Sequence, residues 1–142
     1  MDLHINFKEL VHSLGDGMVI SDAQGTIVYW NPAAERIFGF TQSEALGQSL
    51  DLIIPERLRK RHNDGYNHSM ETRTTSYGDK LLAVPATHKS GRPLSIAFTV
   101  SMIFDAEKKT VGVAAVIRDD TARFSDERNL RKRILELEGA NK

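Results

Sequence analysis

The sequence contains no cysteine, which removes several classes of protein at once. Without a thiol the chain forms no disulfide, no thiolate–metal site and no cysteine nucleophile. An excess of one charge is also missing, because 19 basic residues balance 19 acidic ones, and a neutral chain has no electrostatic reason to bind nucleic acid or an anionic membrane surface. No apolar run approaches the roughly 20 residues of a membrane span, and the polar start is unlike a signal peptide. We therefore expect a cytoplasmic protein whose partner is neither nucleic acid nor a membrane.

What the chain does contain is enough apolar sequence for one folded domain. Its 142 residues are 40% hydrophobic, a length and composition typical of a single domain with additional helices. We predict a core domain over residues 16–121, an amphipathic helix within 1–15 and a charged helix within 122–142.

The most informative stretch is a predicted strand that runs directly into a helix. Residues 27–30 are all β-branched or aromatic, which favours a strand. Asn31 then stands where a helix N-cap belongs, and Pro32 stands at the first helical position, where its missing N–H has no intrahelical partner to lose. Gly39 is placed to end this helix. We expect Trp30, at the end of the strand, to pack in the core.

Other local signals predict the remaining elements. Thr41 and Glu44 have the spacing of a capping box, in which each side chain satisfies a backbone N–H at the start of a short helix. Alternating apolar residues indicate strands farther along the chain. The further predicted elements are a helix at 3–14, a strand at 18–20, a turn at 22–25, a helix at 56–72, a loop at 73–80, and strands at 81–88, 93–104 and 110–118. This order predicts an α+β fold, a five-stranded antiparallel sheet with short helices on one face.

Three motifs in this order resemble the PAS domain of the sensory-box type. The first is the strand–Asn31-Pro32–helix stretch, and the second is the hairpin sequence at 89–93, in which Ser90 replaces the family's usual aspartate. The third is the run at 118–121, similar to the family's Arg-Asp-x-Thr ending, where the last strand passes into a signalling helix. The resemblance implies a signal-sensing module and not an enzyme. The absence of cysteine excludes the cysteine–flavin adduct of light-sensing relatives.

Motifs of catalysis are missing from the sequence. It has no glycine-rich phosphate loop, no histidine pair at metal-ligand spacing and no nucleophile elbow. Asp119 and Asp120 are adjacent, so their side chains tend to point apart, and we interpret them as junction residues.

One histidine is expected to face the interior. On the helix predicted at 56–72, Leu58, His62, Tyr66 and Met70 recur every fourth residue and therefore share one face. That face carries the apolar groups and should cover the sheet, where a buried imidazole needs a partner. The other histidines, His4, His12, His68 and His88, are expected at the surface.

The run around His62 partially resembles that of haem-binding oxygen-sensor PAS domains. These relatives hold iron through a histidine in an Arg-His-Asp-x-Tyr run, whereas here the run at 61–66 is one residue longer. The resemblance implies that His62 would be the metal ligand if haem b is bound. The alternative is a structural histidine bonded to a neighbour, with the cofactor unknown.

Sheet residues opposite this helix complete the candidate site. Haem-sensing relatives place an arginine that faces bound oxygen on the strand corresponding to 81–88, but this chain has leucine, valine and proline there, and no donor for oxygen. The candidate cofactor-binding residues are Leu58, His62, Tyr66, Met70, Leu82, Val84, Phe98 and Met102.

The two terminal helices carry apolar stripes. Leu130, Ile134 and Leu137 are spaced four and then three residues apart, as in a heptad seam, and the first helix has a stripe of its own. That stripe consists of Phe7, Leu10, Val11 and Leu14. These seams predict a homodimer through the terminal helices. The alternative is that each helix packs on its own domain.

Three functions are compatible with this sequence. The first is a sensor that binds a small ligand or cofactor and relays its state through residues 119–121 and the last helix to an output domain or partner. The second is a ligand-free dimerisation or protein-interaction module. The third is a small-molecule enzyme, for which only Tyr66 and His62 offer functional groups inside the predicted pocket.

Overall fold

The computed structural model describes residues 3–74 and 80–140, so most of the predicted loop 73–80 lies outside the described residues. Five strands form one antiparallel sheet in the spatial order β2-β1-β5-β4-β3. The strands are β1 (Gly17–Asp22), β2 (Ile27–Trp30), β3 (Leu82–Thr87), β4 (Pro93–Phe104) and β5 (Thr110–Asp119). This confirms the predicted α+β fold and the position of every predicted strand.

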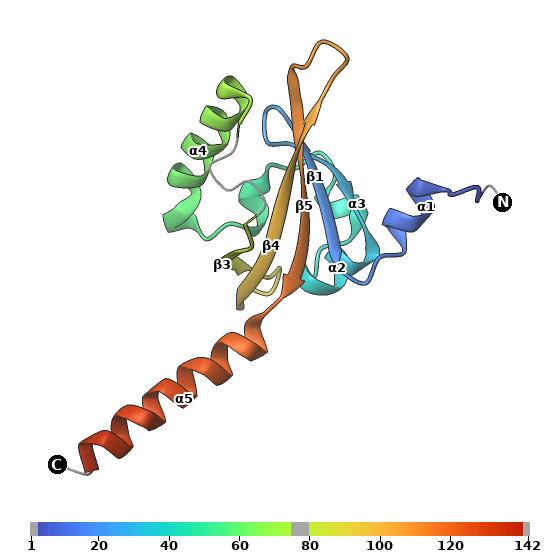
Figure 1. The fold of residues 1–142 in the computed structure, drawn as a ribbon. Helices are drawn as coiled ribbons and strands as arrows, with labels where there is room; N and C mark the ends of the chain where they lie inside the picture. Colours follow the sequence, from blue (N-terminus) through green and yellow to red (C-terminus); the bar gives the residue numbers. More distant parts are fainter. Residues whose placement is uncertain (1–2, 75–79, 141–142) are drawn as a thin grey trace.

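The helices between β2 and β3 lie on the inner face of the sheet (Figure 1). They are α2 (Pro32–Phe38), α3 (Gln42–Ala45), the short 3-10 helices η1 (Leu50–Ile53) and η2 (Glu56–Leu58), and α4 (Arg59–Thr72). Two further helices flank the sheet, α1 (Phe7–His12) and α5 (Thr121–Ala140). Figure 1 shows α1 at one edge and α5 projecting away from the sheet.

Asn31 makes the predicted cap and three further hydrogen bonds. Its side-chain oxygen accepts from the backbone N–H of Ala34 at 3.0 Å, which caps α2, and from that of Met18 at 2.8 Å. Its amide group donates to the carbonyl oxygens of Val11 and Asp16, both at 3.1 Å. Since Asn31 is completely buried, this one side chain ties the chain before β1 to the start of α2.

The other predicted local features are also present. Thr41 and Glu44 form the capping box of α3. Trp30 is completely buried, its ring lies 5.3 Å from that of Phe38, and its indole N–H donates to the carbonyl oxygen of Phe40 at 3.0 Å. Gly39 ends α2 with φ +82°, a left-handed conformation that glycine adopts without strain.

Some sequence expectations were wrong. The first helix spans only six residues instead of 3–14, because Asn6 caps it by accepting from the N–H of Glu9 at 3.1 Å. The sequence predicts His88 at the surface, but it is half-buried. Its ring packs so closely on Gly39 that a Cβ atom at that position would lie 2.5 Å from it. The η1 helix had no predicted counterpart. The last helix begins at Thr121.

Candidate functional site

The inner face of the sheet has a closely packed half and a looser half. The packed half lies against α2, α3 and η1, and its side chains are almost fully buried. They include Val19, Ile27, Trp30, Ala34, Phe38, Ala45, Ile53, Ala86, Leu94, Ile96 and Ile117. Farther along β4 on the same face, Phe98, Val100 and Met102 are only half-buried, as is Val113 opposite Met102 on β5. Apolar side chains on this half are therefore incompletely covered.

Helix α4 contacts β5, and it buries none of its residues completely. Leu58, His62, Tyr66 and Met70 are all half-buried, whereas His68 is exposed. The four-residue spacing therefore identified the less exposed face of the helix. The role of these four side chains as ligand contacts stays a prediction.

Tyr66 ties α4 to β1. Its hydroxyl group donates to the carbonyl oxygen of Asp22 and lies 2.9 Å from the hydroxyl oxygen of the buried Ser21. Burial raises the pKa of Tyr66, and the nearby Asp22 carboxylate adds to this, so the phenol stays protonated near neutral pH. These contacts hold the hydroxyl group of Tyr66 at the end of β1.

His62 sits beside a pair of polar residues that the sequence did not predict. Its Nδ1 lies 3.4 Å from Oδ1 of Asn63, and Nδ2 of Asn63 donates to Oδ1 of Asp51 at 3.1 Å. Burial lowers the pKa of His62, while Asn63 and the Asp51 carboxylate oppose this shift. The imidazole is therefore neutral at pH 7, the form that binds a metal. Helix periodicity could not have identified Asp51, which lies in η1.

The four predicted sheet residues share one face of the sheet. Leu82 pairs with Phe98 across β3 and β4, and Val84 pairs with Ile96. Leu82, Val84, Phe98 and Met102 are each half-buried. Phe98 and Val84 also pack against the core, so the predicted strand phase is correct, whereas binding of a ligand to these residues stays a prediction.

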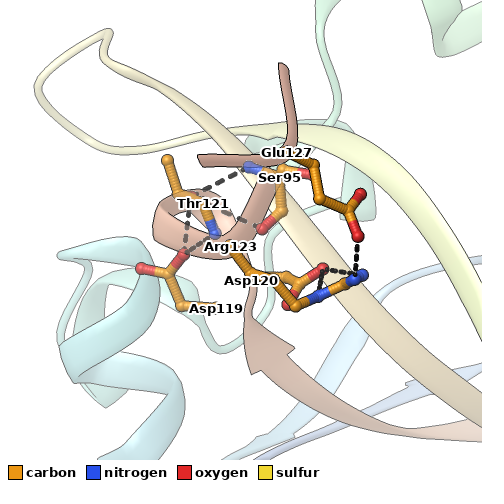
Figure 2. A network of polar contacts seen from close by, with 6 residues as sticks. All are labelled: Ser95, Asp119, Asp120, Thr121, Arg123 and Glu127. Atoms are coloured by element: carbon orange, nitrogen blue, oxygen red, sulfur yellow. Dashed lines mark hydrogen bonds and ion pairs between the residues drawn. The ribbon is translucent and has the colours of Figure 1, made fainter. Parts of the chain in front are cut away.

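The junction between β5 and α5 is a compact polar network (Figure 2). One carboxylate oxygen of Asp119 accepts from the backbone N–H and the hydroxyl of Thr121, at 3.0 and 2.6 Å. The Thr121 hydroxyl oxygen accepts from the N–H of Ser95 on β4 at 3.0 Å, and the carbonyl oxygen of Ser95 accepts from the N–H of Asp120 at 2.8 Å. The first turn of α5 is thus held to β4 as well as to β5, as expected of junction residues.

Asp120 extends this network along α5. Arg123 donates to carboxylate oxygens of Asp120 and Glu127, each at 2.8 Å, and its hydrogen bonds lower the pKa of Asp120. Beyond this first turn the helix has no cover, because Leu130, Ile134 and Leu137 are 61%, 53% and 56% exposed. The predicted apolar seam is therefore open to solvent in the single chain.

Comparison with known proteins agrees with this geometry. Residues 6–119 match the family described as the PAS fold. The chain belongs to the PAS family. It is 35% identical over 71 residues to the sensor protein FixL of Bradyrhizobium diazoefficiens, covering 50% of this chain and 14% of FixL. It is 25% identical over 122 residues to the oxygen sensor protein DosP of Escherichia coli, covering 86% of this chain and 15% of DosP. The chain thus spans about one seventh of each relative.

Solved structures show the same fold. The PAS domain of a protein from Colwellia psychrerythraea superposes with a TM-score of 0.71 at 22% identity, covering 82% of this chain and 95% of that one. The structure of a sensory box histidine kinase/response regulator from Burkholderia thailandensis superposes with a TM-score of 0.66 at 21% identity, covering 94% and 98%. Identities this low establish the fold alone.

Over residues 3–74 and 80–140, no helix combines the length and the apolar character needed to cross a bilayer. Over the same part of the chain, no three His, Asp or Glu side chains gather as a metal site.

A surface depression of about 370 Å³ lies at α1 and β2, away from α4, and is lined by Asn6, Lys8, Glu9, His12, Tyr29 and Gln42.

Proposed function

We propose that this PAS domain is a sensor that binds a small ligand or cofactor between α4 and the sheet. One observation carries the proposal: His62, whose pKa is lowered by burial, lies on the half-buried face of α4, and apolar side chains on the inner face of the sheet are incompletely covered. Ligand sites in proteins combine apolar walls with a small number of placed polar groups. The side chains available to form the walls are Leu58, Tyr66, Met70, Leu82, Val84, Phe98 and Met102.

Haem b is the cofactor that this donor set fits best. A single imidazole among apolar side chains is a suitable ligand for haem iron, and His62 would be that ligand. Bound haem would supply an iron able to bind a small gas molecule. Leu82 and Val84 have no hydrogen-bond donor, so these two positions would offer only apolar contact to such a gas.

The signal would leave the domain through the junction of Asp119, Asp120 and Thr121. Thr121 bonds to Ser95 on β4, and β4 also carries Phe98 and Met102 of the candidate site. A small shift of β4 caused by the ligand would therefore act directly on the first turn of α5. The output would be a further domain or a partner protein, which is consistent with the sensor proteins that the chain resembles.

A test of ligand binding uses the two histidines of α4. Adding haemin to the purified protein should produce a Soret absorption band, and His62→Ala should abolish or shift it, because the axial ligand is lost. The matched control is His68→Ala, since His68 is on the same helix but exposed. A band that is unchanged in His62→Ala would contradict the assignment of His62.

A second candidate function, a dimerisation module without ligand, is favoured by the open seam of α5. The exposure of Leu130, Ile134 and Leu137 supports a homodimer through the terminal helices, because a coiled coil would cover these side chains. Leu130→Asp with Ile134→Asp should convert a dimer into a monomer in light scattering. The control, Ser125→Asp with Lys132→Asp, places two aspartates one heptad apart on the outer side of the helix.

The two functions are distinguishable. If the wild type neither acquires a spectrum with haemin nor gains thermal stability with any small ligand, while the seam variant still dissociates, the module functions by dimerisation alone. A seam variant that stays dimeric would place the interface elsewhere.

A further inference from the structure

A short chain of polar side chains runs from η1 to His62. Asp51 lies in η1, Asn63 lies on α4 directly after His62, and all three residues are half-buried. The Asn63 side chain stands between the other two, with one end of its amide 3.1 Å from Oδ1 of Asp51 and the other end 3.4 Å from Nδ1 of His62. The order of these contacts determines where the protons lie.

Donor and acceptor chemistry leaves one arrangement. An ionised carboxylate only accepts hydrogen bonds, so the end of the Asn63 amide that faces Asp51 must be its NH₂ group. The end that faces His62 is then the carbonyl oxygen, which only accepts. His62 can satisfy that oxygen only if its Nδ1 carries the proton. The reverse orientation of Asn63 would place a carbonyl oxygen against a carboxylate, and two acceptors repel each other.

We propose that Asp51, acting through Asn63, fixes His62 in the tautomer protonated at Nδ1. The lone pair of Nε2 is then always available, and the site selects ligands that accept or share that pair: a metal centre with an open axial position, or a molecule with an N–H or O–H donor. This inference rests on the proposed function in treating the surroundings of His62 as the ligand site. Asp51 and Asn63 are positioning residues, since they act through His62.

Burial gives this arrangement its importance. In water an imidazole exchanges between its two neutral tautomers, and only the one with an unprotonated Nε2 can bind a ligand through that atom. At His62 the surroundings favour the neutral ring, so the choice between two neutral tautomers decides whether Nε2 can act as a ligand. Metal-binding histidines in general rely on such an outer partner, and its loss typically weakens metal binding about ten- to hundredfold.

The tautomer is measured directly by nitrogen-15 NMR of the histidine rings, at a pH well above the usual imidazole pKa. In the ligand-free wild type, Nδ1 of His62 should appear protonated and Nε2 unprotonated, while exposed His68 should show the averaged signals of a free ring. Finding the proton on Nε2 of His62 would overturn the proposal. No variant is needed for this first result.

Three variants then test the role of Asp51. Asp51→Ala should release His62 toward the averaged signals, and so should Asn63→Ala, which serves if the first variant does not fold. Asp51→Glu should preserve the wild-type tautomer, because its carboxylate still only accepts hydrogen bonds and so still requires the NH₂ group of Asn63 to face it. If Asp51→Ala leaves the ring signals unchanged, Asp51 does not position His62.

Haemin titration separates positioning of His62 from a purely structural role of Asp51, because a structural role would not change the haemin affinity of a folded variant. Asp51→Ala should weaken haemin binding about ten- to hundredfold relative to Asp51→Glu, with the two variants equally folded. Equal affinities would count against the positioning role. Failure of haemin to bind the wild type would refute the proposed cofactor and not the tautomer, which the ligand-free spectrum decides by itself.

Discussion

The two halves of the sheet's inner face are packed in different ways. Beside α2 and α3, large side chains such as Trp30, Phe38 and Ile117 are almost fully buried. Beside α4, no helix residue is completely buried, and Phe98 and Met102 opposite are only half-buried. Burial of apolar side chains contributes most of the stability of a small domain. Apolar side chains that are incompletely covered can instead be buried by a bound ligand. The comparison shows that one sheet carries both the core and the candidate site.

The largest expected effect comes from removing the same side chain in each half. Phe38→Ala should lower the free energy of unfolding by about 3–5 kcal/mol, because it leaves a cavity in closely packed surroundings. Phe98→Ala should cost only about 1–2 kcal/mol, since less of its apolar surface is buried. Urea denaturation of both variants measures the difference. Equal losses would mean that the half beside α4 is as well packed as the other.

A smaller effect is expected at Asn31, which belongs to the packed half. Asn31→Ala should cost about 2–3 kcal/mol, more than the ~1 kcal/mol of a cap alone, because partners besides the helix N-terminus lose a hydrogen bond. Asn6→Ala is the control, since Asn6 caps the exposed α1 with one hydrogen bond and should cost no more than about 1 kcal/mol. A loss at Asn31 equal to the control would reduce its role to capping.

The smallest expected effect concerns pH and the half beside α4. Burial lowers the pKa of His62 in the folded state below the 6.5 of the unfolded chain. The unfolded state therefore binds the proton first, and stability should fall as the pH drops below about 6.5. The nearby Asp51 carboxylate limits this loss. In the ligand-free domain, His62→Gln should reduce the pH dependence of the thermal midpoint, whereas His68→Gln should not.

An unchanged pH profile in His62→Gln would have a clear meaning. It would show that the imidazole is as well solvated in the folded domain as in the unfolded chain. The half beside α4 would then be open to water, and not only incompletely packed.

Much of the fold could be predicted because its signals are local. The cap at Asn31, the capping box of Thr41 and Glu44, and the left-handed Gly39 depend on hydrogen bonds and dihedral angles within a few residues. Strand alternation likewise identified the inner face of β4, because side chains of a strand point to opposite sides in turn. The four-residue spacing on α4 found the less exposed face of that helix for the same reason.

Tertiary structure decided what depends on residues far apart in the sequence. The bonds of Asn31 to Val11 and Asp16, the ring of His88 against Gly39, and the contact of Asp51 with Asn63 involve partners that no local pattern connects. How closely each half of the sheet is covered is also non-local, because it depends on the helices that reach it. The sequence alone thus determined most of the elements and their faces, and packing between distant segments decided which half of the inner face of the sheet became core and which half stayed incompletely covered.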